Sequence, residues 1–473
     1  MKNKHSRAEE NSQFDVVVVG SGPSGVHAAY PLIKAGLKVA MVDGGLDSNK
    51  QDDKQTFLEN DISNTSNAYD LLKKNSYVFN KTYQLLKIKS EIEIIQSLAK
   101  GGLSEIWHGI CDYFSKEELE RVGLPSLEIQ KEYEEIAKRI RLTAKGHLDL
   151  HSALLLESVK NRAHLASTAY QAFLAFPLRT SSLIEDFKQY KNFTYIPNQV
   201  VRNVNYKMKR VEIQSFSLDT LRESTILSRY VVLAAGSINT TRILMRSLNL
   251  FNYRTTFLTK AHYMSACWFP RMIFKKNNLK KARLGQVAIS SKETQQGLGT
   301  FFIQLYKFNP SSLRKALKYI PLPKMIGLRV LSFIAQSLII VDIRFPALES
   351  KGKFSLLRKK KDEDILEISF QESEAELASH KNELRRIAKQ LRSLGLFPIK
   401  TVSDYATAHY AGGVPFAGAQ VKLSTDKNGK LHQASRIYVA DSSTWRSLPA
   451  KPPTLTIMAN ASRVGKNVLR IFH

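Results

Sequence analysis

Cysteine is scarce in this sequence, and its scarcity excludes two kinds of structure. Only Cys111 and Cys267 occur among the 473 residues, and they lie far apart in the chain. Two distant thiols provide neither a disulfide framework nor the ligand spacing of a cysteine metal site. We therefore expect both thiols to be buried in a protein of a reducing compartment, with no bound metal.

Long apolar runs are also missing. Residues 1–13 are polar and charged, without the apolar stretch of a secretory signal, which favours a cytoplasmic protein. The most apolar stretch, residues 325–342, is interrupted by Arg329 and Gln336 and is shorter than the ~20 apolar residues that a spanning helix needs. No internal repeat or low-complexity linker occurs. The chain is longer than the ~250–300 residues at which single cores stop growing, which predicts two domains.

Acidic residues are few for a chain of this size. Asp and Glu total 42 against 70 Lys and Arg, which gives a formal net charge of +28. The excess is uneven, because residues 271–361 hold 20 basic and three acidic residues, a net charge of +17. Such a surface attracts anions, for example phospholipid headgroups, nucleotides or acidic glycans. A lysine-rich genome is the alternative explanation, but it does not account for the clustering.

The apolar part of this basic region admits two interpretations. Lysines and arginines flank apolar residues along the segment 307–361. This pattern suits a helix lying on an anionic membrane surface, which would make the protein peripheral on the inner face of the membrane. The alternative is a helix and a strand of a substrate domain with a solvated basic rim. Nucleic acid is not favoured as a partner, because no recognition motif occurs.

A dinucleotide-binding motif lies near the amino terminus. The β-branched run Phe14–Val19 predicts a buried parallel strand, and it leads directly into Gly20–Gly25, a G-x-G-x-x-G sequence. A predicted helix over Val26–Ala35 and a second strand over Leu37–Val42 follow, and Asp43 closes that strand. This order, with an acid at the end, is typical of a Rossmann-type domain.

Each residue type in the motif has a physical role. Gly20 allows a tight turn, Gly22 lets the backbone approach a pyrophosphate, and Gly25 lets the helix pack closely on the strand. The free N–H groups at the start of the helix, around Ser24, attract phosphates. Asp43 lies 18 positions after Gly25 and would accept hydrogen bonds from ribose hydroxyls. The alternative is that Asp43 is a surface turn residue.

Further segments carry turns marked by glycine or proline. Paired glycines let a backbone approach a flat or charged ligand closely, and proline suits the first position of a helix. Leucines and isoleucines near helical spacing also predict amphipathic helices over 374–396 and 126–142. The marked segments are Gly101–Gly109, Arg229–Leu244 with a turn at Ala235–Gly236, His409–Gly413, Ile437–Ser443 and Leu448–Ala461.

Together these motifs resemble the glucose–methanol–choline (GMC) oxidoreductase family, whose order they follow. The resemblance covers the termini and the middle strand, and it does not clearly cover 116–190 or 251–400. It implies an α/β fold with a Rossmann-type FAD-binding domain, in which helices cover a parallel sheet, and an α+β substrate domain with an antiparallel sheet. The expected FAD-binding domain is discontinuous, over 14–115, 191–250 and 400–473, and 116–190 and 251–399 would form the substrate or cap domain.

The resemblance also implies FAD as the cofactor. Some members carry a histidine bound covalently to flavin just before the position of Trp107; here that residue is Ile106, and His108 comes one position too late. A noncovalent flavin is therefore expected. The backbone of Val200 would hold the adenine, and the helix that opens at Pro453 would face the flavin. The implied cofactor-binding residues are Gly20, Gly22, Ser24, Gly25, Asp43, Gly101, Gly102, Ser104, Val200, Ala235, Gly236, Asp441, Pro453 and Thr454.

The resemblance implies a catalytic pair, of which only one member is present. His409 matches the histidine that takes the proton of an alcohol while hydride passes to flavin N5, and a pKa near neutrality suits histidine to this work. The second position, a histidine or asparagine in the family, is Pro452, which has no side-chain donor or acceptor. His409 could equally be a structural histidine that lines the flavin, or an unrelated core histidine.

These observations leave three functions open. The first is an FAD-dependent oxidoreductase of CH–OH groups, with His409 as base, acting on an anionic or lipid-linked, sugar-like alcohol. The second is a flavin reductase or monooxygenase reduced by NAD(P)H, which the proline at 452 motivates. The third is a catalytically impaired flavin-binding scaffold in a membrane-associated biosynthetic complex. The sequence fixes neither the electron acceptor nor the oligomeric state.

Overall fold

The computed structural model describes most of the chain. The described residues are 13–47, 85–107, 109–143, 148, 150–160, 169–174, 179–273, 287–291, 300–307, 323, 325–327, 337–349, 352–358, 364–403 and 408–472.

A parallel sheet, covered by helices on both faces, forms the centre of the Rossmann-type part of the fold. Its strands are β1 (Phe14–Val19), β2 (Val39–Val42), β7 (Phe193–Ile196), the end of β10 (Glu223–Leu233) and β20 (Ile437–Val439). The order is β7-β2-β1-β10, with β20 pairing beside β10. Residues Val16–Val18 are fully buried because helices cover both faces of the sheet. The predicted strand Phe14–Val19 is confirmed, and the second begins two residues later than predicted.

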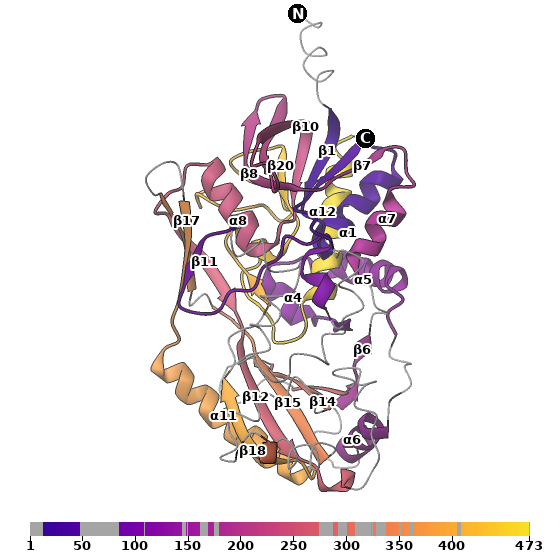
Figure 1. Cartoon of the computed structure of the whole chain (residues 1–473), viewed down its shortest axis with the longest axis vertical. Coiled ribbons are helices and arrows are strands. Elements are labelled where there is room, and N and C mark those ends of the chain that lie inside the picture. Colours follow the sequence, from indigo (N-terminus) through magenta and orange to yellow (C-terminus); the bar gives the residue numbers. More distant parts are fainter. Residues whose placement is uncertain are drawn as a thin grey trace, which may run out of the picture.

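Helices from both ends of the chain cover one face of this sheet. Helix α1 (Pro23–Lys34) packs against α12 (Thr454–Leu469), and α8 (Gly236–Ser247) covers the opposite face (Figure 1). The approach of α1 and α12 is close, since a Cβ atom on Gly465 would lie 2.3 Å from the carbonyl oxygen of Ala28. The two termini therefore build one layer of one domain, as the discontinuous motifs predicted.

An antiparallel meander and a mixed five-stranded sheet extend this domain. Strands β8 (Gln199–Lys207) and β9 (Arg210–Ser217) form a meander with the first half of β10. A five-stranded sheet packs against α8 and has the order β19-β11-β16-β17-β3. Its strands are β3 (Ile88–Ser90), β11 (Arg254–Thr259), β16 (Gly352–Arg358), β17 (Asp364–Phe370) and β19 (Tyr410–Ala411).

A six-stranded antiparallel sheet forms the far end of the molecule (Figure 1). One face is apolar and packs on α11 (Glu374–Ser393) and α6 (Leu150–Lys160), while the other face carries polar side chains such as Asp342 and Arg344 beside apolar ones such as Ile340. Successive residues of a strand point to opposite faces of the sheet, so the two faces can differ in this way. The predicted antiparallel sheet and the helix over 374–396 are confirmed. The strands are β5 (Ala169–Gln171), β12 (Ala261–Trp268), β13 (Val287–Ser290), β14 (Phe302–Lys307), β15 (Leu338–Phe345) and β18 (Phe397–Ser403).

Elements from outside the predicted FAD-binding ranges also pack against the Rossmann-type layers. Helices α5 (Ser126–Arg139) and α7 (Thr180–Phe187) pack on α12 and α1, so much of 116–190 belongs with the Rossmann-type layers. Strands β11, β16 and β17, within 251–399, also pack there. The remaining short elements are α4 (Lys116–Val122), β4 (Ile110–Cys111), β6 (Phe173–Leu174), and the 3₁₀ turns η2 (Gly102–Ile106), η3 (Pro270–Met272) and η7 (Ser442–Thr444).

The apolar stretch 325–342 is not one membrane-surface helix. Residues 338–342 lie in β15, where they are buried between β12 and β14, so this part of the prediction is wrong. Met325 and Ile326, in a short helical turn, are exposed. Most of the other residues of 307–361 on which the membrane prediction rested lie outside the described ranges. Within the described ranges, no helix is long and apolar enough to cross a membrane. Cys111 and Cys267 are buried free thiols, as expected.

Candidate active site

Two glycine turns lie against each other at the carboxyl end of β1. Gly20 has φ +100°, and a Cβ on Gly25 would lie 1.9 Å from the carbonyl oxygen of Gly20, so both positions require glycine. The second turn, at Gly101 and Gly102, also has positive φ angles. A Cβ on Gly102 would lie 3.6 Å from Gly22 Cα, which shows how closely the turns approach. The structure thus brings the two predicted glycine motifs together.

Asp43 joins these turns through a buried hydroxyl. The Ser21 hydroxyl donates to Asp43 Oδ2 at 2.5 Å and accepts the backbone N–H of Gly101 at 2.8 Å. The Tyr195 hydroxyl and the backbone N–H of Gly45 donate to the same carboxylate oxygen. Burial raises the pKa of Asp43 to about 6, although these hydrogen bonds act in the opposite direction. Asp43 therefore supports the two glycine turns, which we call the cradle, and is not a surface turn residue.

The Ser104 hydroxyl is committed to holding the second turn in place. It donates to the carbonyl oxygen of Gly101 at 2.7 Å, lies 2.7 Å from the Thr180 hydroxyl, and accepts the Thr180 backbone N–H. Thr180 in turn contacts the carbonyl oxygens of Ser21 and Gly101. Ser104 thus supports the cradle through its side chain. Sequence analysis missed Thr180 and Ser21, because each acts through contacts that are remote in the chain.

Asp441 closes a third turn, at the start of α8. Its carboxylate accepts the Gly236 N–H at 2.9 Å, the Thr240 hydroxyl at 2.5 Å and the Ser443 N–H at 3.0 Å. Asp441 is 2% exposed, and burial raises the pKa of its carboxyl. The predicted residues Ala235, Gly236 and Asp441 are therefore neighbours. The open space beside Gly236, where a Cβ would meet no atom within 4 Å, leaves room for a ligand.

The arrangement fits a dinucleotide with a pyrophosphate. Helix α1 begins at Gly22 without a side-chain cap, which leaves its first N–H groups for an anion. A Cβ on Gly22 would meet only the carbonyl oxygen of Gly101, at 3.8 Å, so the space above this glycine is open to a ligand. Ser24 is buried in the first turn of the same helix. The donor set therefore suits a phosphate group held by backbone amides.

The remaining predicted cofactor residues lie in β8 and at the start of α12. Val200 lies in β8 opposite Phe216, and it is 7% exposed. Helix α12 begins with Pro453 as its amino-terminal cap and Thr454 as its first residue, one position later than predicted, and again without a side-chain cap. The uncapped amides at this terminus can interact with a negatively charged group.

His409 directly precedes β19, and two hydrogen bonds hold Gly412, the residue that follows this strand. The Ser237 hydroxyl donates to the carbonyl oxygen of Gly412, and the Gly412 N–H donates to the carbonyl oxygen of Ser442. Nδ1 of His409 is buried, and no hydrogen bond from a described residue reaches it. Burial, Lys260 and Arg344 together hold the pKa of His409 well below its usual range. The imidazole is neutral near physiological pH and can accept a proton.

A polar network lies on the face of the six-stranded sheet that is opposite α11. Asp342 Oδ1 accepts His262 Nε2 at 2.8 Å, and Arg344 Nη2 donates to Asp342 Oδ2 at 2.7 Å. The Tyr306 hydroxyl lies 3.0 Å from Asp342 Oδ2 and also donates to Gln304. Although burial alone would raise it, Arg344 and His262 hold the pKa of Asp342 well below its usual range. No sequence pattern predicted this network, because its members come from three different strands.

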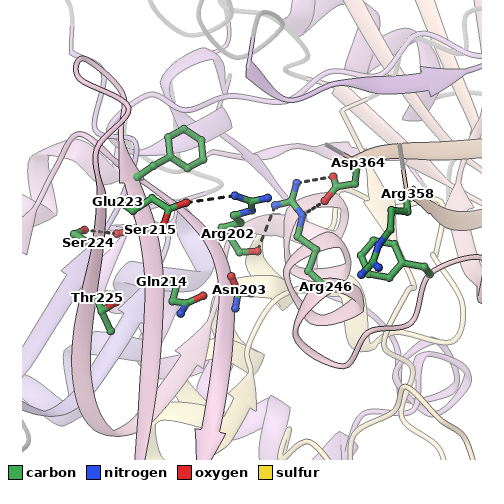
Figure 2. Close-up of a pocket in the computed structure, with 12 residues that line it drawn as sticks. Arg202, Asn203, Gln214, Ser215, Glu223, Ser224, Thr225, Arg246, Arg358 and Asp364 are labelled. Atoms are coloured by element: carbon green, nitrogen blue, oxygen red, sulfur yellow. Dashed lines mark hydrogen bonds and ion pairs between the residues drawn. The ribbon is translucent and has the colours of Figure 1, made fainter. Parts of the chain in front are cut away.

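A cavity that is open to solvent lies elsewhere. Figure 2 shows this space of about 290 Å³ between the meander, α8 and strands β16 and β17. Two of its arginines are paired with acids: Arg246 donates to Asp364 at 2.6 Å, and Arg202 pairs with Glu223. None of the predicted cofactor or catalytic residues lines it. We regard the Asp364 cluster as a link between α8 and β17.

Comparisons with known proteins agree with this geometry. Residues 349–461 match a family model described as GMC oxidoreductase, and this range contains His409 and Pro452. Among solved structures, the crystal structure of pyridoxine 4-oxidase from Mesorbium loti is similar over 96% of this chain and 99% of that chain. The TM-score is 0.64 and the sequence identity 12%, a likeness that shows the fold. No curated protein shows significant sequence similarity to the chain.

Proposed function

We propose that this chain is a divergent GMC oxidoreductase and that it is an FAD-dependent oxidoreductase acting on an alcohol carbon, because residues 349–461 match the model of that family. The paired glycine turns, the uncapped start of α1 and the acid at Asp43 are the parts that would hold the adenosine and pyrophosphate. Flavin, when bound, accepts a hydride from the substrate carbon. We further propose that the flavin is held noncovalently, because position 106 is isoleucine.

The observation that carries this proposal is the state of His409. It is a neutral imidazole whose buried Nδ1 has no described hydrogen-bond partner. It also lies in the glycine loop that packs on the start of α8. A neutral histidine held in place by its backbone is suited to accept the proton of an alcohol. The cations Lys260 and Arg344 disfavour the imidazolium, so the proton would leave His409 readily after each turnover.

We propose that the substrate is an anionic or lipid-linked, sugar-like alcohol. Three cationic or protonatable groups (Lys260, Arg344 and His262) act on His409, against the single acid Asp342. This balance favours a substrate with a negative group. The amide and hydroxyl of Gln304 and Tyr306 on the same sheet face suit the hydroxyls of a sugar. The net charge of +28 favours approach of anionic molecules and of anionic membrane surfaces.

The proline at position 452 favours a second candidate function. It removes the side chain that would complete the catalytic pair, and the Asn460 carbonyl, further along α12, is already bound to Arg463. A flavin reductase or monooxygenase reduced by NADH or NADPH needs no such pair. A scaffold that holds flavin without turnover needs none either.

The test is anaerobic reduction of the flavin in purified protein supplied with FAD. Pyridoxine, free sugars, sugar phosphates and a polyprenyl-linked sugar are offered first, then NADH and NADPH. We expect an alcohol to bleach the flavin, and His409→Ala to slow this step by about 10²–10⁴-fold with the flavin retained. His432→Gln is the matched control, because His432 Nε2 contacts only the carbonyl oxygen of Ala417 at 2.9 Å.

The other outcomes decide between the rival functions. Bleaching by NADH or NADPH alone would replace the alcohol reaction with the second candidate function. A flavin that no alcohol and no nicotinamide reduces, in wild type and variant alike, would support the scaffold. A protein that takes up no FAD would remove the cofactor from the proposal.

A further inference from the structure

A buried lysine lies beside the position where the catalytic pair is incomplete. Lys260 is 0% exposed, and its Nζ donates to the carbonyl oxygens of Ala450 at 3.1 Å and Lys451 at 2.6 Å. These two residues come immediately before Pro452. The amine therefore reaches the segment whose missing side chain left His409 without a partner, although it arrives from a different part of the chain.

Strand pairing places the same lysine next to His409. Strands β11 and β19 are antiparallel, with Leu258 opposite Ala411 and Thr259 opposite Tyr410. Continuing this register by one residue puts Lys260 opposite His409. Opposite residues of an antiparallel pair have Cα atoms ~4.5–5.5 Å apart. Lys260 is also the side chain whose charge acts most strongly on His409. The register and the electrostatics follow from the same packing, and both place the two residues close together.

In its ammonium form, Lys260 has one N–H left for a ligand. A lysine ammonium carries three donors, and the described hydrogen bonds use two, both to backbone carbonyls. No carboxylate among the described residues forms a salt bridge with this Nζ. Burial and the neighbouring Arg344 lower the pKa of Lys260 well below its usual value, while Glu118 and Asp342 act in the opposite direction. A buried cation without a carboxylate partner is costly for stability alone, so a function in the site would explain its presence.

We propose that Lys260, the residue between strands β11 and β12, is the second catalytic residue and does what the side chain at position 452 does in relatives. This rests on the proposed function. As the alcohol reacts, His409 accepts the hydroxyl proton, and the C–H bond breaks with its electron pair passing to the oxidised flavin as hydride. The carbon–oxygen bond becomes a carbonyl. The third Nζ–H of Lys260 donates to the hydroxyl oxygen throughout and stabilises the negative charge that develops on it, so Lys260 keeps its protons.

A purely structural role is the competing explanation, because Lys260 also fixes the backbone at 450–451. Two variants separate the roles. Lys260→Gln keeps two N–H donors for the two carbonyls but removes the charge and the third donor. Lys260→Arg keeps charge and donors. Lys466→Met is the matched control, since Lys466 is a lysine of α12 whose Nζ pairs with Glu132 and Glu135 away from His409.

The experiment measures sulfite affinity of the FAD-loaded protein and, separately, the rate of flavin reduction by whichever alcohol bleaches the wild type. Sulfite adds to oxidised flavin as an anion, so a nearby cation strengthens its binding without any substrate. We expect Lys260→Gln to weaken sulfite binding by at least about tenfold and to slow reduction by about 10²-fold. Lys260→Arg should recover much of the sulfite affinity, and Lys466→Met should match the wild type in both.

The outcomes separate this inference from the proposed function. A wild-type protein without flavin, or one that no alcohol reduces, contradicts the proposed function itself. If the wild type is reduced but Lys260→Gln keeps wild-type sulfite affinity and reduction rate, only the role of Lys260 is overturned. If Lys260→Gln loses its flavin, the Lys260→Arg variant decides the question. Wild-type flavin content together with unchanged sulfite affinity in Lys260→Arg would support the role of the positive charge. A tenfold loss of sulfite affinity in Lys260→Arg, with the flavin retained, would overturn that role.

Discussion

At the residue scale, Asp43 shows how one carboxylate is prepared for a ligand. Three donors converge on its Oδ2, and its position at the end of β2 is the one at which a ribose is bound in dinucleotide folds. Burial makes its negative charge costly, as the pKa of about 6 indicates. The negative charge of Asp43 lies where the ribose hydroxyls of a bound dinucleotide could donate further hydrogen bonds to it.

We expect Asp43→Asn to weaken FAD binding by about 10–100-fold, because a hydrogen bond to a charged group contributes about 1.5–3 kcal/mol. The apo-protein should lose little stability near neutral pH, since the variant removes a buried charge. FAD titration followed by flavin fluorescence measures the first effect, and urea unfolding the second. Asp47→Asn is the control, because the Asp47 side chain is 63% exposed and lies 3.5 Å from Lys100. Equal FAD affinity in both variants would exclude Asp43 from the site.

Single residues were predictable from sequence where the backbone itself imposes the requirement. Gly20 and Gly25 follow from the motif, because only glycine tolerates the φ angle of one and the 1.9 Å approach of the other. Lys260 and Thr180 were not predictable, because their roles depend on contacts with partners about 190 and 76 residues away. No local pattern of sequence encodes such distances.

At the element scale, two glycines at the start of α1 have different functions: Gly22 leaves space for a ligand, and Gly25 allows close packing of the backbone. We expect Gly22→Ala to leave the apo-fold intact, because the new Cβ would meet nothing nearer than 3.8 Å and φ is −67°. FAD affinity should fall by at least about tenfold, since the methyl group occupies the space through which a pyrophosphate approaches. Gly25→Ala should unfold or strongly destabilise the protein with or without FAD. Thermal unfolding and FAD titration distinguish the two; a Gly22→Ala protein with wild-type affinity would place the pyrophosphate elsewhere.

The elements that sequence analysis placed correctly are those with a clear period or motif. The β-branched run at 14–19 and the amphipathic pattern at 374–396 each had one interpretation. The apolar run at 338–342 had two, because a short apolar segment between basic residues fits a buried strand and an interfacial helix equally. Its identity as β15 is decided by pairing with β12 and β14, whose residues lie tens of positions earlier.

At the scale of the whole molecule, the two ends of the chain pack against each other. Helices α1, α12 and α5 share one layer, although they come from the beginning, the end and the second hundred of the chain. The motifs at the termini predicted that the ends meet. They did not predict that α5 and α7 belong to this layer, because an amphipathic helix shows which face it buries and not against which domain.

One histidine in this layer makes global stability depend on pH. Burial and Arg139 lower the pKa of His27 to about 3, and its Nδ1 lies 3.0 Å from Arg139 Nη1, which joins α1 to α5. Its ordinary pKa is about 6.5. Between these values the unfolded chain binds a proton that the folded protein excludes, so unfolding becomes easier as the pH falls below about 6.5. His409, with a pKa also lowered, acts in the same direction. Asp43, with a raised pKa, acts in the opposite direction between about 4 and 6.

A single variant isolates the contribution of His27 to the pH dependence of stability from those of His409 and Asp43. His27→Asn keeps an acceptor for Arg139 but cannot be protonated, and it leaves His409 and Asp43 as they are. The difference in unfolding free energy between wild type and variant should therefore change by about 1.4 kcal/mol per pH unit from about pH 6 to about pH 4, with the wild type losing more. Urea unfolding of the apo-protein at several pH values measures it. Parallel curves would mean that His27 reaches solvent in the folded protein, and that the layer formed by the two ends of the chain opens more readily than its packing indicates.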